Sequence, residues 1–473
     1  MRLAWFSPMP PVPSGIAACS AELVSELGTG HTIDVYAHTT TPASGVNVNR
    51  GSVNSAHDFV WRHRLRPYDL TIYQLGNSSH HDYIWPYLFR YPGLTVLHDA
   101  HLHHARAAAL LRTQRQADFR DEFAANHPGV SRDLAELAVA GFDSQLYYEW
   151  PMTRLVISAS RLTAVHSRPL MHQIQGELPE ARVTAIRLAH GRLVSDDEVP
   201  RLRSSVRGKY GIAEHAIVFG VFGGLTPDKR LPQILNAFEA IVPYAPSAQL
   251  LLAGAPPRHY DAGADVARRG LESRVTITGY LADESDFTAC IAACDVSLNL
   301  RWPTAREMSG PWLRALAAGR PTITVDLAHM VDVPALDPRT WKMNHAANRD
   351  SQLAARAERV DGVANHANRE PRTANREPVT VAIDILDEDH SLRLAMRRLA
   401  TDPALRASLG DAGRRYWERE HSMPRMVDDY ERVMAEAAAS PIPQVTLPSH
   451  LVNDGDRVLN DTLAQFSLRS AWE

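Results

Sequence analysis

Cysteine and long apolar runs are scarce in this chain of 473 residues. Its three cysteines, Cys19, Cys290 and Cys294, are too few for a disulfide framework, and the last two are expected to pack as small apolar residues on one helix face. No run reaches the roughly 18 apolar residues of a membrane span. Residues 1–8 are too short, and too soon broken by proline, for a signal peptide. These absences favour a cytoplasmic protein, while contact with a membrane surface stays open.

An excess of charge of one sign is missing as well. The chain has 50 Lys and Arg against 54 Asp and Glu, which leaves a formal net charge of -4. This balance gives no basic footprint for nucleic acid, so none is expected as a partner. Lysine itself is rare, with only Lys209, Lys229 and Lys342. Lys229 lies in a glycine-bearing loop, where a compact ammonium suits a diphosphate, although chance is an alternative at this count.

What the sequence does contain is a regular alternation of apolar runs and helical patterns in an ordinary globular composition, 45% hydrophobic and 22% charged. Continuous apolar runs are typical of parallel strands covered on both faces. In the first half they predict strands at Leu3–Ser7, Thr32–His38, Leu70–Leu75, Leu94–His98, Leu162–His166 and Val183–Leu188. The pattern restarts near Arg201, with strands at Ile217–Phe222, Gln249–Ala253, Val275–Tyr280, Val296–Leu300 and Thr322–Val325 and helices near Pro232–Ile241, Asp261–Arg269, Glu284–Ala293 and Pro311–Ala318.

The fold class that follows is α/β, with two doubly wound domains at residues 1–200 and 201–402. Ligands of such sheets bind at the carboxyl ends of the strands, and two facing sheets make a cleft. The segment 341–378 interrupts the second domain with a repeated Ala-Asn-Arg-Glu-Pro and reads as an inserted mobile loop. Helical pattern resumes at Ile383–Ala400 and fills residues 403–440, which are expected to cross back to the first domain. A Pro-rich linker and tail occupy residues 441–473.

Two motifs of the first domain follow expected strands. Ser14 and Gly15 come between the first strand and a helix, where Ser14 can cap the helix and Gly15 lets backbone approach a ligand, although any strand-to-helix turn has this composition. His98 ends a strand, where it can hydrogen-bond a sugar hydroxyl; the alternative is a buried histidine beside a helix-capping Asp99. Further histidines nearby do not converge at a spacing that fixes three or four ligands, so no metal is expected.

Two motifs of the second domain also follow strands. In the first, Gly223 and Gly224 precede Thr226 and Asp228, either of which could cap the next helix, and Lys229 and Arg230 could reach a diphosphate. A solvated pair of surface cations is the alternative. In the second, Glu307 and Met308 precede Ser309 and Gly310 at an expected helix start, where a carboxylate can accept from sugar hydroxyls while amides bind phosphate. Glu307 could instead only complement the helix dipole.

Together these residues resemble the retaining glycosyltransferases of the family-4 type, which have two facing Rossmann-like domains, the GT-B arrangement. The resemblance covers nearly the whole chain except 341–378 and the last thirty or so residues. It matches Ser14-Gly15 to the glycine-bearing loop, His98 to the histidine near the donor sugar, and Lys229 to the lysine that grips the diphosphate. Glu307 matches the first acid of the Glu-x7-Glu element.

This chain departs from that pattern in three places. Gly224 stands where the family has an arginine, Arg230 where it has a glycine, and Arg314, or by strict count Ala315, where it has the second acid. Contacts of the second acid to a ribose are therefore in doubt.

The resemblance implies transfer of a sugar from a nucleoside-diphosphate sugar to a carbohydrate, lipid-linked or other small acceptor, with retained anomeric configuration and without a metal or other cofactor. The implied catalytic residues are His98, Lys229 and Glu307. The implied donor-binding residues are Gly15, Gly223, Gly224, Arg230, Met308, Ser309, Gly310 and Arg314. A sugar-nucleotide epimerase, a phosphorylase and a catalytically quiet nucleotide-sugar-binding protein remain alternatives. A phosphorylase would need a cofactor lysine, and neither Lys209 nor Lys342 lies in a promising loop.

Overall fold

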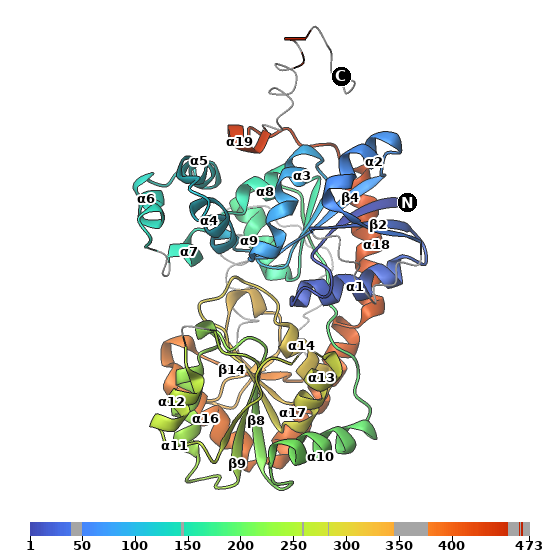
Figure 1. Cartoon of the computed structure of the whole chain (residues 1–473). Helices are drawn as coiled ribbons and strands as arrows, with labels where there is room; N and C mark the ends of the chain where they lie inside the picture. The colour runs from blue at the N-terminus through green and yellow to red at the C-terminus, as the bar shows by residue number, and fades with distance from the viewer. Residues whose placement is uncertain are drawn as a thin grey trace, which may run out of the picture. The chain divides into compact units, whose positions relative to one another are not determined.

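The chain divides into two compact units in the computed structural model (Figure 1). The first contains Met1–Arg187, Ala305–Met308 and Met426–Glu473, and the second contains Leu188–Thr304 and Ser309–Arg425. The structure describes residues 1–38, 50–142, 146–257, 260–281, 283–344, 377–452, 463 and 465–466. The sequence placed the first boundary at residue 200, which falls inside a helix of the second unit, Glu198–Tyr210.

The first unit is built on a seven-stranded parallel sheet of order β3-β2-β1-β4-β5-β6-β7. Its strands are β1 (Arg2–Phe6), β2 (Thr32–Ala37), β3 (Gly51–Ser55), β4 (Leu70–Leu75), β5 (Leu94–Leu97), β6 (Leu162–Val165) and β7 (Val183–Ala185). The central strand β4 is buried at all six positions, as its continuous apolar run predicts. The edge strand β3 was missed because its residues, Gly-Ser-Val-Asn-Ser, are polar.

Nine helices join the strands of the first unit within the described residues. They are α1 (Gly15–Leu27), α2 (Phe59–Leu65), α3 (Trp85–Arg90), α4 (His103–Leu111), α5 (Gln116–Asn126), α6 (Asp133–Val139), α7 (Leu146–Glu149), α8 (Arg154–Ala159) and α9 (Arg168–Glu177). Helix α1 begins where expected, because the Ser14 side chain accepts from the Ile16 amide at 3.3 Å. Helices α4 to α7 group together beside the sheet (Figure 1) and share a small core of their own that includes Leu110, Phe119 and Phe123.

The second unit repeats the design with a parallel sheet of order β10-β9-β8-β11-β12-β14-β13. Its strands are β8 (Ile217–Phe222), β9 (Ala248–Ala253), β10 (Val275–Ile277), β11 (Val296–Asn299), β12 (Thr322–Val325), β13 (Ala335–Leu336) and β14 (Thr380–Ile383). Its helices are α10 (Glu198–Tyr210), α11 (Leu231–Ile241), α12 (Ala262–Arg268), α13 (Glu284–Ala293), α14 (Gly310–Ala317), α16 (Glu388–Thr401) and α17 (Pro403–Glu420). The two-sheet α/β fold class is thereby confirmed.

Two expectations about the C-terminal part of the second unit need correction. Ile383, expected to start a helix, ends strand β14 instead, and α16 begins five residues later at Glu388. Within the expected insert 341–378, Met343 bridges to Leu336 of β13, so the segment does not leave the fold at Trp341. Residues 345–376, which hold the Ala-Asn-Arg-Glu-Pro repeat, lie outside the described residues.

The C-terminal helix α18 (Met423–Ala439) starts in the second unit and continues in the first, as the crossover expectation requires. In the first unit its buried Tyr430 stacks on Trp5 of β1, with ring centroids 5.7 Å apart. The tail follows: Leu447 and Leu451 pack on the first unit's core, and Nε2 of His450, in the short α19 (Ser449–Val452), lies 2.8 Å from Glu122 Oε1. The tail is therefore docked as far as Val452.

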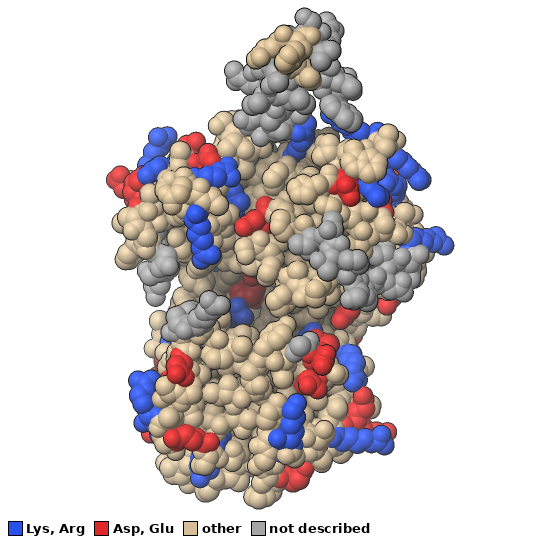
Figure 2. Space-filling model, in the orientation of Figure 1, with Lys and Arg blue, Asp and Glu red and all other residues tan. Residues whose placement is uncertain are grey.

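The surface charges agree with the balanced composition of the chain. On the face drawn in Figure 2, acidic and basic side chains of the described residues are interspersed. Cys290 and Cys294 are both buried, as expected, but only Cys290 lies within α13; Cys294 is the C-cap of that helix, and its Sγ is 3.3 Å from the Cys290 carbonyl oxygen. In the part of the chain that the structure describes, no helix is both long and apolar enough to cross a membrane.

Candidate active site

Three of the four predicted motifs follow strands at the point where each sheet reverses its order, and the fourth, at His98, follows β5. In the first sheet the reversal lies between β1 and β4, and β1 leads through Ser14 to Gly15 at the start of α1. In the second sheet it lies between β8 and β11, which lead to Gly223 and to the loop before Ser309. Doubly wound sheets bind ligands outside the strand ends at this reversal. Each unit therefore has its candidate residues at the expected place in its own sheet.

Lys229 is held against the carboxyl end of β8. Its side chain is buried, and Nζ donates to the carbonyl of Phe222, the last residue of that strand. Gly223 follows with φ +84°, a left-handed conformation, and a Cβ built there would lie 3.4 Å from Lys229 Nζ and 3.7 Å from Pro311 Cγ. The ammonium is thus near both the glycine turn and the first turn of α14, as a phosphate cradle requires.

Helix α14 starts at Gly310 and has Ser309 as its N-cap. The Ser309 side chain accepts from the Trp312 amide at 3.3 Å, and Pro311 occupies the first turn. The ring of His190 covers Gly310 so closely that a Cβ there would meet His190 Cδ2 at 2.4 Å. Burial, followed by the charge of Arg314, lowers the pKa of His190 to about 3, so its ring is neutral at physiological pH. Sequence reasoning missed His190, because nothing in its local pattern marks it.

The two arginines expected to bind the donor form ion pairs within the second unit. Arg230 has a left-handed backbone, φ +59°, and its Nε lies 2.8 Å from Glu388 Oε1. Arg314 is buried and pairs with Glu284. Their donor contacts stay predictions, and the structure gives each a structural partner that the sequence did not suggest.

The capping expectations for α11 were wrong. Its N-cap is Arg230, and neither Thr226 nor Asp228 caps it with a side chain. Instead, Asp228 Oδ2 lies 3.3 Å from Arg301 Nη1. Gly224 is open, since a Cβ there would meet only Thr226 Cγ2 at 3.9 Å.

Glu307 and Met308 belong to the loop after β11, yet residues Ala305–Met308 cluster with the first unit. The Ala305 carbonyl accepts from the Ala100 amide at 2.8 Å, which ties this loop to the segment that follows β5. Glu307 Oε1 is buried from solvent. The chain therefore carries Glu307 with one unit and Ser309, two residues later, with the other.

His98 lies just beyond β5 in a polar network of the first unit. Its Nε2 is 2.7 Å from Gln74 Oε1, a carbonyl oxygen that can only accept, so Nε2 carries the hydrogen. Its Nδ1 then accepts from His166 Nε2 at 3.2 Å. Gln74 Nε2 in turn lies 3.3 Å from the Tyr430 hydroxyl. Both nitrogens of His98 are therefore occupied, and a hydrogen bond to a sugar would have to replace one of these partners.

The alternative interpretation of the His98 motif was a helix-capping Asp99. Asp99 does not cap a helix; its Oδ2 accepts from the Asn77 amide at 2.6 Å. The first-unit residues Gln74, His166 and Tyr430 were all missed, although Gln74 and His166 lie at or just after strand ends, the signal that found His98. Among the described residues, no three His, Cys, Asp or Glu side chains converge as metal ligands.

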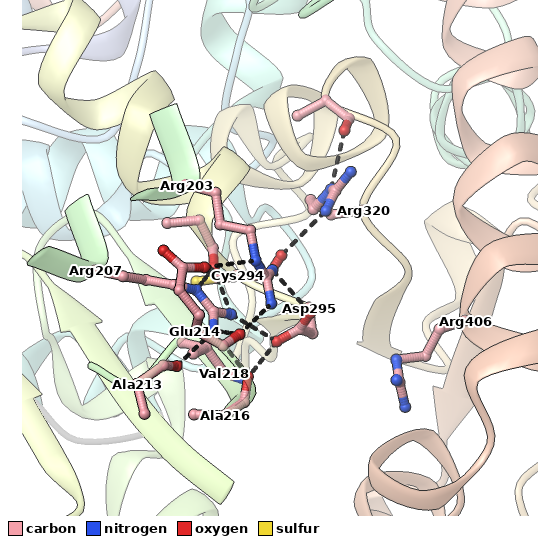
Figure 3. Close-up of polar contacts among 12 residues, drawn as sticks. Arg203, Arg207, Ala213, Glu214, Ala216, Val218, Cys294, Asp295, Arg320 and Arg406 are labelled. Atoms are coloured by element: carbon pink, nitrogen blue, oxygen red, sulfur yellow. Dashed lines mark hydrogen bonds and ion pairs between the residues drawn. The ribbon is translucent and has the colours of Figure 1, made fainter. Parts of the chain in front are cut away.

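Arg203, Arg207 and Asp295 form an ion cluster in the second unit (Figure 3). Arg203 and Arg207 converge on Asp295, with nitrogen-to-oxygen distances of 2.9 Å for each. Asp295 immediately precedes β11, and its Oδ2 also accepts from the Val218 amide at 2.7 Å. These residues join the starts of β8 and β11, so the cluster is structural and marks the edge opposite to Lys229.

Comparison with known proteins shows a family and a curated relative that resemble parts of this chain. Residues 216–359 match the model of the family described as Glycosyl transferases group 1. A curated relative, an alpha-D-kanosaminyltransferase of Streptomyces kanamyceticus, is 27% identical over 110 residues, which are 23% of this chain and 28% of that protein. The match thus spans little more than a quarter of the relative's length.

Solved structures match the fold over almost the whole chain. A sucrose-phosphate synthase of Thermosynechococcus elongatus has a TM-score of 0.58 at 14% identity, with 92% of this chain and 98% of that chain covered. HepE of Anabaena, solved with UDP-glucose, has a TM-score of 0.57 at 13% identity, covering 92% and 99%. WaaG, a glycosyltransferase involved in lipopolysaccharide biosynthesis, has a TM-score of 0.54 at 14% identity, covering 93% and 100%.

The fold and the placement of the candidate residues define a protein of the GT-B class, two parallel-sheet α/β units with C-terminal helices that return to the first. Within that class, residues 216–359, which include β8 to β13, are similar to the family of glycosyl transferases group 1.

Proposed function

We propose that this protein transfers a glycosyl group from a nucleoside-diphosphate sugar to an acceptor hydroxyl, with retention of anomeric configuration. The observation that carries the proposal is the buried Lys229 ammonium at the end of β8, beside the Gly223 turn and the first turn of α14. The HepE structure with UDP-glucose supports a nucleotide sugar as donor. The acceptor class that we propose is a carbohydrate, a lipid-linked sugar or another small hydroxyl compound.

The chemistry follows from the charges that develop. As the bond between the anomeric carbon and the phosphate oxygen breaks, the nucleoside diphosphate leaves with the bonding electrons, and the acceptor oxygen bonds to the same carbon and loses its proton. Lys229 and the amino-terminal dipole of α14 stabilise the charge on the β-phosphate, an interaction that strengthens towards the transition state. We propose no metal, because Lys229 supplies the cation.

Glu307 and His98 are proposed to hold the donor sugar. Sequence and site contain no identified pair of carboxylates at the spacing of a double-displacement glycosidase. Transfer on the face from which the diphosphate leaves is the route that retains configuration without such a pair. We propose that the leaving diphosphate accepts the proton of the incoming hydroxyl, since His98 already donates and accepts within its own unit.

Substitution of Lys229 tests the proposal. A panel of nucleotide sugars is first screened for thermal stabilisation, since a ligand raises the melting temperature by mass action. With the donor found, Lys229→Ala should lower kcat/KM by roughly 100-fold or more, the usual loss when one charge-stabilising group is removed. Lys209→Ala is the matched control, because Lys209 is exposed and pairs only loosely with Asp286 at 3.7 Å. Equal activity of both variants would contradict the proposal.

A catalytically quiet nucleotide-sugar-binding protein is the second candidate, favoured by one observation. The family resemblance places an acid on α14 at Arg314 or, by strict count, at Ala315, and Arg314 is ion-paired to Glu284. Donor binding with neither hydrolysis nor transfer across a wide acceptor panel would establish that function. Turnover of the nucleotide sugar without any acceptor would instead indicate an epimerase.

A further inference from the structure

Arg314 is fixed by three elements of the second unit. It lies in the second turn of α14, its side chain is 7% exposed, and Nη1 pairs with Glu284 Oε1 at the start of α13. Its guanidinium carbon lies 5.5 Å from the ring centroid of Phe287, one turn further along α13. Gly191 packs against it from the other side, where a Cβ would meet Arg314 Cγ at 2.8 Å. These contacts direct the Arg314 guanidinium towards Glu284 and Phe287.

Glu284 is the exposed end of this arrangement. Its side chain is 56% exposed, and the ion pair with Arg314 uses Oε1. Glu284 is the first residue of α13, which follows β10 at the strand-end edge of the sheet. The pair therefore presents a carboxylate, not a cation, at this edge.

Two series of contacts connect the Glu284 carboxylate with the Lys229 cradle, which consists of the Lys229 ammonium, the Gly223 turn and the first turn of α14. Phe222, whose carbonyl accepts from Lys229, packs edge-on against Phe287 with ring centroids 5.9 Å apart, and Phe287 is three residues from Glu284 on the same helix. On α14, Pro311 borders Gly223 and Arg314 follows three residues later, a rise of about 4.5 Å at 1.5 Å per residue. Arg314 is thus about one helical turn from the residue of α14 that borders Gly223, and Glu284 is its ion-pair partner.

We propose that Glu284 accepts hydrogen bonds from the ribose hydroxyls of a nucleoside diphosphate, and that Arg314 is the positioning residue that holds it there. The inference rests on the proposed function. When the diphosphate occupies the cradle, the next group of the nucleotide is its ribose, and a carboxylate with a free oxygen is the acceptor that vicinal hydroxyls require. Helix α13 then supplies the acid that α14 lacks at Arg314.

The test uses nucleotides with and without the ribose hydroxyls. UDP, GDP and ADP are titrated into the full chain by calorimetry, and the one that binds is compared with its 2′-deoxy and 3′-deoxy forms. Glu284→Gln should weaken binding of the ribonucleotide roughly 10- to 100-fold, the range for a hydrogen bond to a charged group. Binding of the deoxy form that lacks the contacted hydroxyl should be weak already and should change little. Asp286→Asn, an exposed carboxylate on the same helix that is 53% exposed and faces Lys209, is the matched control.

Arg314→Met should give the same loss as Glu284→Gln, and the double variant should lose no more, because both changes remove one directed carboxylate. Circular dichroism confirms folding, and the exposed Glu284→Gln variant keeps the test valid if Arg314→Met fails to fold. An equal ribo-to-deoxy ratio in the wild type and in Glu284→Gln would overturn the assignment while leaving the proposed function in place. Absence of binding by all three nucleotides in the wild type would instead overturn both.

Discussion

At the scale of single residues, Gly310 is the position where the candidate site tolerates least change. Gly310→Ala would place Cβ 2.4 Å from His190 Cδ2 and 2.8 Å from Nε2, closer than real Cβ contacts allow. We expect a loss of about 1–3 kcal/mol in unfolding free energy, the usual cost of overpacking. Urea unfolding of the full chain measures it. Gly208→Ala is the control: it lies inside α10 with nothing within 4 Å of the new Cβ, so it should stabilise by roughly 0.5–1 kcal/mol.

The His190 ring is the cause of this expected loss, which a second variant can show. His190→Ala removes the ring, so Gly310→Ala should cost less in that background than alone. Additive losses in the double variant would mean that backbone conformation, and not the ring, excludes alanine at 310.

A variant of Arg230 can distinguish a structural role of this residue from a contact with the donor. Its φ of +59° is one that glycine adopts without strain, so Arg230→Gly should relieve backbone strain and lose the ion pair with Glu388, two small opposing effects. We expect a stability change within about 1 kcal/mol. If Arg230 contacts the donor phosphate as predicted, the donor KM should rise tenfold or more in steady-state assays with stability unchanged. A donor KM within about twofold of wild type would contradict that contact and leave Arg230 only its ion pair with Glu388.

Residue types predicted the local turns well and the partners poorly. Ser14 was predicted to cap a helix, and the structure confirms it. Ser309 was placed only at an expected helix start, and the structure shows that its side chain caps α14. The pairings of Arg230 with Glu388 and of Arg314 with Glu284 span 158 and 30 residues. Such contacts depend on which elements the fold brings together, so no local pattern could reveal them.

At the scale of elements, the buried ion cluster at the start of β8 and β11 binds the second sheet together (Figure 3). Arg207 is fully buried and donates to the carbonyls of Ala293, Glu214 and Ala216 as well as to Asp295. Burial lowers the pKa of Arg207, yet an arginine stays protonated in proteins, so its charge depends on Asp295 for balance.

Asp295→Ala should therefore destabilise the second unit by about 3–5 kcal/mol, the cost of leaving a buried charge unpaired. Differential scanning calorimetry should show a lowered transition for that unit. Nucleotide affinity of the folded protein should change less than twofold, because the cluster lies at the edge opposite to Lys229. A selective loss of nucleotide binding without lower stability would contradict this structural role.

Elements were predictable where their residues were apolar throughout. Strands such as β4, β8 and β12 match the expected ranges because each is a continuous buried run. Strand β3 is polar, since an edge strand is covered less, and β14 was merged with a helical pattern because its apolar run continues into Ile385 and Leu386. Of the candidate site, the strand-end positions of the glycines, of His98 and of Lys229 could be predicted in this way, and their roles in donor binding stay predictions. The side chains that surround them could not be predicted.

At the scale of the whole molecule, buried neutral histidines should set the acid limit of stability. Burial is the leading cause that lowers the pKa of His81 and His127 to about 4 and of His103 and His190 to about 3, from about 6.5. The unfolded chain therefore binds more protons than the native state below pH 6.5. The stability that these groups contribute is complete above that pH and is lost as the pH falls towards 4. Asp82 offsets part of this loss, since burial raises its pKa to about 6, so the native state binds a proton there before the unfolded chain does.

The loss should fall mainly on the first unit, which contains His81, His103 and His127, whereas the second contains His190. Each fully buried histidine costs about 1.4 kcal/mol per pH unit below 6.5, so His81 and His103 together should cost the first unit roughly 4 kcal/mol at pH 5. Calorimetry between pH 8 and pH 5 should show its transition falling faster than that of the second unit. His103→Asn should flatten this dependence, and His57→Asn, at an exposed position, should leave it unchanged. Parallel shifts of both transitions, unaffected by His103→Asn, would contradict the assignment.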